Sequence, residues 1–220
     1  MFSAELRVAA ADLWEAQHAH PFVTGIGDGT LPADRFAHWV CQDHLFLVDY
    51  ARLLALGAAR APDLVTMRRF AELTAGILGE EMELHRALAA ELGITQAKLD
   101  AEEAAPATAA YTDFLLRTAA LGDYAELAAA LLPCMWGYSE VGERLAAGGR
   151  PGHPQYDAWI DTYAAREFAA LAAWCRELVD DLAADAAPAL RSRMRRAFVT
   201  CSRHELAFWE MGWSLERGET

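Results

Sequence analysis

The chain has 220 residues, of which 54% are hydrophobic, so it can bury a sizeable core in one domain or at most two small ones. Its net charge of −13 argues against nucleic-acid binding, because no cluster of lysine and arginine offsets that charge. No 18-residue run is free of charged residues, and the N-terminus lacks a signal-peptide pattern. We therefore expect no membrane span, no membrane partner and a cytoplasmic protein.

Helix signals follow one another along the whole chain, and alternating strand patterns are missing. In the first half we expect helices over 3–19, from Thr30 to about 60, from Pro62 to Leu92 and over 95–99, with a loop at 21–30. In the second half we expect helices from Pro106 to Gly122, from Asp123 to Gly148, over about 155–183, and from Pro188 almost to the end. Seven long helices and a short one, with short loops, predict an all-α fold, a single-domain helical bundle over residues 1–220.

The four cysteines are expected to be free thiols. They lie at positions 41, 134, 175 and 201, all inside helical patterns and too far apart for a CxxC motif. For most buried cysteines the role is that of a small hydrophobic side chain.

The stretch LLPCMWGYSEVG, residues 131–142, places a proline and a cysteine inside a predicted helix. Pro133 cannot donate a backbone hydrogen bond, so a bend is expected there. Cys134, Gly137 and Tyr138 are spaced so that they share one face, where the glycine leaves room beside the thiol. A pocket and an ordinary core helix both remain compatible with this spacing.

Two carboxylates are expected to face inward. Asp43 and Phe46 share a helix face and have apolar neighbours at helical spacing, and a buried carboxylate is costly unless it is paired or used. Glu205 shares a face with Cys201, Phe208 and Trp209. Aromatic surroundings are expected to raise the pKa of Glu205 and to suit it to acid catalysis.

Metal and cofactor motifs are weak. A di-iron carboxylate bundle needs two Glu-x-x-His pairs, and only Glu15 with His18 fits. A haem with His18 or His20 as the axial ligand is a minor alternative, since isolated histidines are usually structural. Glycine-rich phosphate loops are missing as well. The sequence therefore predicts no cofactor and no metal.

Four stretches together resemble the TenA/thiaminase II family. They are CQDHLFLVDYARLLA, AAYTDFLL, AALLPCMWGYSEVGERL and SRHELAFWEMGW, and their order fits along nearly the whole chain. The resemblance implies the all-α haem-oxygenase-like bundle and a homotetramer. It also implies a hydrolase of thiamin salvage that releases 4-amino-5-hydroxymethyl-2-methylpyrimidine from the aminomethyl compound or from thiamin.

The resemblance also implies roles for single residues. Cys134 matches the family's nucleophile, Glu205 the acid that faces a pyrimidine nitrogen, and Asp43 the carboxylate on the amidine edge of the ring. Tyr111, Tyr138 and Tyr163 match aromatic and hydroxyl positions of the same pocket. Phe46 departs from the family, because many members have tyrosine there.

Two other functions stay open at this point. Phe46 gives some weight to a non-catalytic protein that binds a pyrimidine or another small aromatic molecule on the same scaffold. A transcriptional regulator fits poorly with the net charge of −13 and the lack of a basic recognition helix.

Overall fold

The computed structural model describes residues 1–218 and every side chain among them except that of Glu80. These residues form twelve α-helices and one π-helical turn, and no strand occurs in the described part. This confirms the all-α prediction. The last two residues of the expected domain 1–220 lie outside the described range, and the single domain itself stays a prediction.

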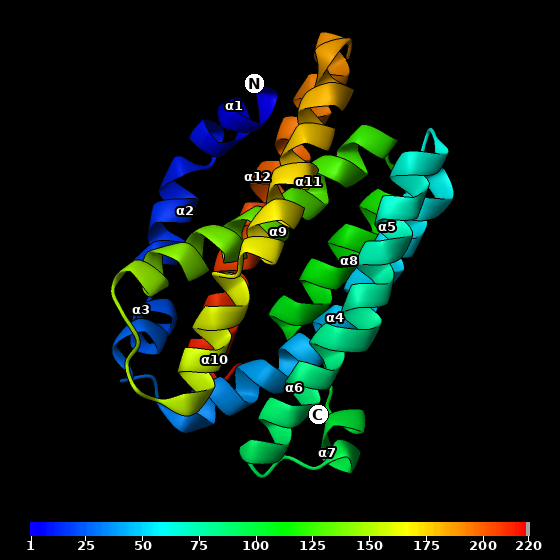
Figure 1. Cartoon of the computed structure of the whole chain (residues 1–220). Coiled ribbons are helices and arrows are strands. Elements are labelled where there is room, and N and C mark those ends of the chain that lie inside the picture. Colours follow the sequence, from blue (N-terminus) through cyan, green and yellow to red (C-terminus); the bar gives the residue numbers. More distant parts are fainter. Residues whose placement is uncertain (219–220) are drawn as a thin grey trace. The chain divides into compact units, whose positions relative to one another are not determined.

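Internal contacts divide the chain into two compact units, which are described one at a time. The first comprises Met1–Pro32 and Ala125–Glu210. Its helices are α1 (Phe2–Ala9), α2 (Ala11–His18), α3 (Pro21–Asp28), nearly all of α9 (Tyr124–Ala147), α10 (Pro154–Tyr163), α11 (Arg166–Ala184) and most of α12 (Pro188–Ser214). Within it α1 packs on α11, and α10 packs on α3 and α11 (Figure 1).

The second unit comprises Ala33–Tyr124 and the C-terminal end from Met211. Its elements are α4 (Ala33–Arg60), α5 (Leu64–Gly76), the π-helical turn η1 (Ile77–Glu81), α6 (Met82–Glu91), α7 (Gln96–Asp100), α8 (Pro106–Leu121) and the end of α12. The long helix α4 is the centre of this unit, because it packs against α5, η1, α6 and α8 (Figure 1).

Three expected boundaries in the first unit are wrong. The helix over 3–19 breaks at Ala10, whose backbone leaves helical geometry with ψ near 16°. The loop at 21–30 is largely the helix α3, which Pro21 opens and the His20 ring caps by accepting a hydrogen bond from the Phe22 amide. The helix over 155–183 divides into α10 and α11 at Ala164–Ala165.

Thr30, near the end of the first unit's N-terminal segment, does not cap a helix, because α4 begins only at Ala33, after Pro32. The hydroxyl of Thr30 instead donates to Asp28. The long helix expected to end at Leu92 contains the π-helical turn η1, which was not anticipated. The short helix α7 begins where expected, with Thr95 as its cap.

A partly buried polar cluster ties α9 to the N-terminal helices. Glu140 of α9 lies 2.9 Å from His18 of α2 and 3.0 Å from Arg7 of α1. Burial alone raises the pKa of Glu140, but the hydrogen bonds from His18 and Arg7 outweigh burial and bring the pKa to about 2. The cluster therefore stabilises the fold while Glu140 is ionised.

This cluster predicts a loss of stability in acid. Because the folded-state pKa of Glu140 is depressed below 4.5, its contribution is complete above pH ~5 and is lost as the pH falls toward 2. The free energy of unfolding, measured by urea titration, should be lower for Glu140→Gln than for the native chain at pH 7, and the two should converge near pH 2. A difference that does not change with pH would contradict this role.

Candidate active site

Cys134 differs from the other three cysteines in its exposure. All four are free, as predicted, and Cys41, Cys175 and Cys201 are buried, whereas Cys134 is partly exposed. It follows Pro133 within α9, which continues through the proline without ending. Burial is the main cause that raises the pKa of Cys41 to about 11, so that thiol is unsuited to nucleophilic chemistry.

An aromatic cluster stands one turn beyond Cys134. Tyr138 of α9 has its ring centroid 4.9 Å from that of Tyr163 at the end of α10 and 5.0 Å from that of Trp209 in α12. Trp159 closes the cluster at 4.5 Å from Tyr163. The structure thus brings together two of the predicted tyrosines and adds two tryptophans, all of them buried. Trp159 was not singled out from the sequence.

Glu205 of α12 and Cys134 of α9 both precede the contact between Tyr138 and Trp209. Glu126 pairs with Arg193 near the start of α9, and Tyr138 meets Trp209 further along, so α9 and α12 run in parallel. Cys134 precedes Tyr138 by four residues, and Glu205 precedes Trp209 by four. Each therefore lies one helical turn before the same aromatic contact. Glu205 is only 2% exposed, so the prediction that it faces inward is confirmed.

Gly142 fixes the position of Tyr163. A β-carbon added at Gly142 would lie 2.5 Å from the carbonyl carbon of Tyr163 and 2.7 Å from the amide nitrogen of Ala164. The backbone where α10 ends therefore lies directly on α9, and only glycine allows this approach. This contact accompanies the break that separates α10 from α11 and sets Tyr163 beside Tyr138.

The room that Gly137 leaves is occupied. An ideal β-carbon at Gly137 would lie 3.2 Å from the side-chain nitrogen of Gln17, which comes from α2 and is 3% exposed. The expected space beside the thiol is therefore bordered by an amide group from the N-terminal helices. The sequence offered no sign of Gln17, since its approach depends on tertiary packing.

The remaining predicted residues lie in the second unit. Phe46 of α4 has its ring 4.9 Å from that of Tyr111 of α8 and 5.3 Å from that of Tyr50. Asp43, one turn before Phe46, is 3% exposed. The helices α4 and α8 therefore place a carboxylate and two phenols around Phe46, all buried.

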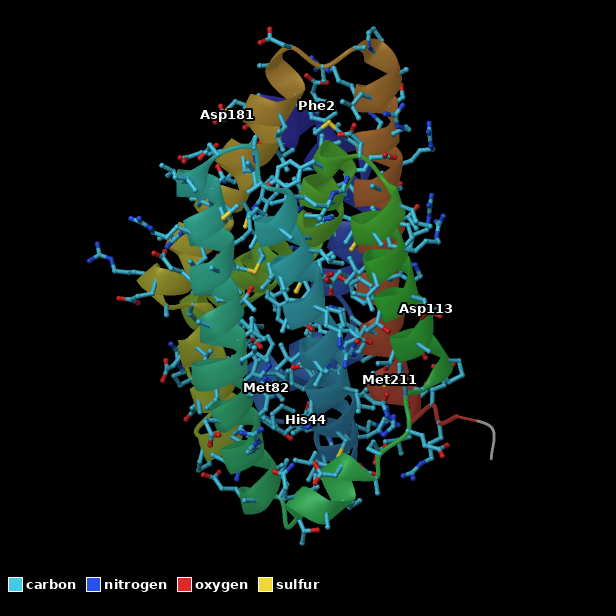
Figure 2. All side chains as sticks on the ribbon, turned by 90° about the vertical axis from the view of Figure 1, so that its right-hand side faces the viewer. Phe2, His44, Met82, Asp113, Asp181 and Met211 are labelled. Carbon is cyan, nitrogen blue, oxygen red and sulfur yellow. The ribbon has the colours of Figure 1, made fainter. Side chains whose placement is uncertain are left out.

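Asp43 has a buried partner that sequence reasoning missed. The Nε2 atom of His85, on α6, lies 3.1 Å from Oδ2 of Asp43, and both side chains are at most 5% exposed. Burial, and to a smaller extent His44, lowers the pKa of His85 to about 4. Asp43 lies on α4 and His85 on α6, and these two helices pack against each other. Figure 2 labels a neighbour of each residue, His44 on α4 and Met82 on α6. The helical spacing of Met82, His85 and Leu88 was the available signal.

The histidines considered as haem ligands have other partners. His18 lies 2.9 Å from Glu140. His20 caps α3 with one ring nitrogen and lies 3.1 Å from Glu210 with the other. Among the described residues, no three histidine, cysteine, aspartate or glutamate side chains group so that they could hold a metal ion. Within residues 1–218, none of the helices combines the length and the apolar character that a membrane span requires.

Comparison with known proteins first defines the fold class. The chain superposes with a TM-score of 0.78 on a Shewanella denitrificans domain with a heme oxygenase-like fold, over 96% of this chain and 92% of that one, at 14% identity. This confirms the haem-oxygenase-like bundle. A TenA homologue from P. horikoshii OT3 gives a TM-score of 0.90 at 33% identity, covering 97% of this chain and 99% of that one.

The sequence then places the chain within that class. Residues 8–215 match the model of the TENA/THI-4/PQQC family. The chain is also 44% identical to the aminopyrimidine aminohydrolase of Halalkalibacterium halodurans over 216 residues, which are 97% of this chain and 96% of that protein. The chain belongs to the TENA/THI-4/PQQC family, as the four sequence stretches predicted.

The close approach at Gly142 yields a direct test. Gly142→Ala forces a methyl group against the backbone of Tyr163 and Ala164, and such overpacking costs about 1–3 kcal/mol. We expect a lower free energy of unfolding in urea and altered fluorescence of the Tyr163–Trp159 cluster. Gly79→Ala is the matched control, because no atom lies within 4 Å of its added β-carbon. Equal stability of the two variants would contradict the role of Gly142.

Proposed function

We propose that this chain is an aminopyrimidine aminohydrolase of thiamin salvage that works by addition of a cysteine thiolate to the pyrimidine ring. It converts 4-amino-5-aminomethyl-2-methylpyrimidine, and thiamin, to 4-amino-5-hydroxymethyl-2-methylpyrimidine. The near full-length identity of 44% to a protein of that name supports this activity. The observation that carries the mechanism is the placement of Cys134 and Glu205, one turn before the same aromatic contact.

The first half of the reaction removes the leaving group. The Cys134 thiolate forms a bond to ring carbon C6, while Glu205 gives its proton to the neighbouring ring nitrogen N1. The electron pair of the enamine so formed expels the amine, or the thiazole of thiamin, from the methylene group on C5. The amine departs with the bonding pair, and an exocyclic carbon–carbon double bond is left. General-acid help of this kind contributes about 10²–10⁴-fold.

The second half adds water and restores the ring. Water attacks the exocyclic methylene carbon and loses a proton, which forms the hydroxymethyl group. The bond between C6 and sulfur then breaks, the thiolate departs with the bonding pair, and N1 returns its proton to Glu205. Oxidation states balance without any cofactor, since the net change replaces an amine by a hydroxyl group.

The other residues bind the ring in this proposal. Asp43 accepts hydrogen bonds from the amidine edge, where the 4-amino group stands beside a ring nitrogen. Tyr111, Tyr138 and Tyr163 supply flat surfaces and hydroxyl groups, and Tyr138 and Tyr163 stand in a packed aromatic cluster. Phe46 offers a ring without a hydroxyl, stacked near Tyr111.

The assembly and cell compartment belong to the same proposal. Four free thiols suit the reducing cytoplasm, and the family resemblance implies a homotetramer. Side chains of Leu64, Val65 and Leu121 are 77–82% exposed, which is a high exposure for large apolar groups and supports contacts between subunits. The net charge of −13 supports the absence of a nucleic-acid partner.

The second candidate is a protein that binds a pyrimidine without turning it over. Phe46 favours it, because the missing hydroxyl removes one polar contact beside Tyr111. Calorimetry with the hydroxymethylpyrimidine, paired with a product assay, separates the two candidates. Tight binding without product would favour the binder.

The activity is tested by incubating the protein with the aminomethylpyrimidine and with thiamin and following the hydroxymethyl product by chromatography. We expect turnover in the native chain and at least a 10²-fold loss in Cys134→Ser, because a serine hydroxyl is a far weaker nucleophile than a thiolate. Cys41→Ser is the control for loss of a sulfur, since that thiol is buried and has a raised pKa.

Two results would overturn this proposal in separate ways. The absence of product from both substrates in the native chain would remove the activity. Turnover retained by Cys134→Ser, with circular dichroism unchanged, would keep the activity but remove Cys134 from the nucleophilic role.

A further inference from the structure

The contact between His85 and Asp43 is almost completely buried. His85 is 2% exposed and Asp43 3%, and Nε2 and Oδ2 stand 3.1 Å apart. A carboxylate removed from water is costly unless a donor satisfies it, and loss of that donor leaves the charge unpaired. Asp43 therefore depends on a partner that comes from a different helix.

The π-helical turn η1 sets the register that brings His85 to Asp43. Up to the first residue of the turn, Phe70, Leu73 and Ile77 are buried at spacings of three and four. After it, the buried positions resume at Met82 and His85, so the step from Ile77 is five residues and not four. An uninterrupted α-helix would have continued this face with Glu81 and Leu84 in place of Met82 and His85. Single π-helical turns of this kind are frequent at functional sites.

The surroundings of His85 define which nitrogen carries its proton. Burial keeps the imidazole neutral at pH 7, because its pKa is lowered to about 4. A neutral ring has one N–H group, and the carboxylate beside Nε2 requires a donor there. Nδ1 is then the acceptor nitrogen of the ring. The indole of Trp39, with its centroid 5.9 Å from the imidazole centroid, packs against the ring.

We propose that His85 is the positioning residue of Asp43: its Nε2 atom, 3.1 Å from Oδ2, fixes the orientation in which the carboxylate is presented to the amidine edge of an aminopyrimidine. This inference rests on the proposed function, in which Asp43 binds that edge. His85 itself does not touch the substrate. Its effect passes through the orientation of one carboxyl group, as partners of ligand-binding groups commonly act.

Kinetics on the intact protein test the proposal with two substitutions at one site. His85→Leu removes the donor, and His85→Gln keeps an N–H group at the end of a side chain of similar reach. Because Asp43 contacts the substrate before and during the reaction, we expect His85→Leu to raise KM about 10–100-fold with a smaller change in kcat. His85→Gln should restore KM to within a few-fold of the native value.

A matched control separates this effect from loss of a buried histidine. His38 lies on α4, the helix of Asp43, is 6% exposed and has Nε2 2.7 Å from the backbone oxygen of Glu216. His38→Leu should lower the free energy of unfolding in urea while leaving KM unchanged. If His38→Leu and His85→Leu raise KM equally, the effect is general destabilisation and the proposal is wrong.

The protonation pattern offers a readout that needs no turnover. Nitrogen-15 NMR of the histidine rings in the native chain at pH 7 should show His85 as a neutral imidazole protonated at Nε2, assigned by its loss in His85→Gln. A proton on Nδ1, or a doubly protonated ring, would overturn the proposal. Absence of product from the native chain would instead refute the proposed function. If the native chain is active and His85→Leu leaves KM unchanged, only the role of His85 is refuted.

Discussion

Two carboxyl side chains, Asp43 and Glu205, lie inside helical packing with only 3% and 2% of their surface exposed, and the rest of the structure has to accommodate this burial. Burial of a carboxyl group costs free energy unless hydrogen bonds or opposite charges satisfy it. Oδ2 of Asp43 lies 3.1 Å from Nε2 of His85. His85 comes from α6, which directly follows the π-helical turn η1. Glu205 lies one turn from Trp209, in a helix parallel to the one that bears Cys134.

The two environments suit two different tasks. In the proposed reaction Asp43, beside a neutral histidine, is the acceptor for the amidine edge of a pyrimidine. In the proposed reaction Glu205, which lies one turn from Trp209, holds a proton and takes it back within one turnover. In the proposed reaction the carboxylate binds, the acid donates to N1, and the thiol forms and breaks one covalent bond.

Helix boundaries could be predicted where proline or glycine marks them, as at Pro106, Gly122 and Pro188. They could not be predicted at Ala10 or at Ala164–Ala165, because alanine gives no stop signal and the second break lies against Gly142 of another helix. The π-helical turn was hidden for a related reason, since its register becomes evident only when the buried face is known. In the first unit, the face of Cys134 and Tyr138 followed from spacing along one helix, whereas the approach of Gln17 depends on packing between helices.

The most direct test of this account is a crystal structure of the protein with 4-amino-5-hydroxymethyl-2-methylpyrimidine. We expect the sulfur of Cys134 to face ring carbon C6, the carboxyl group of Glu205 to contact N1, and Asp43 to receive the 4-amino group. A ring bound out of reach of the Cys134 sulfur, or one that neither carboxyl group contacts, would contradict the account.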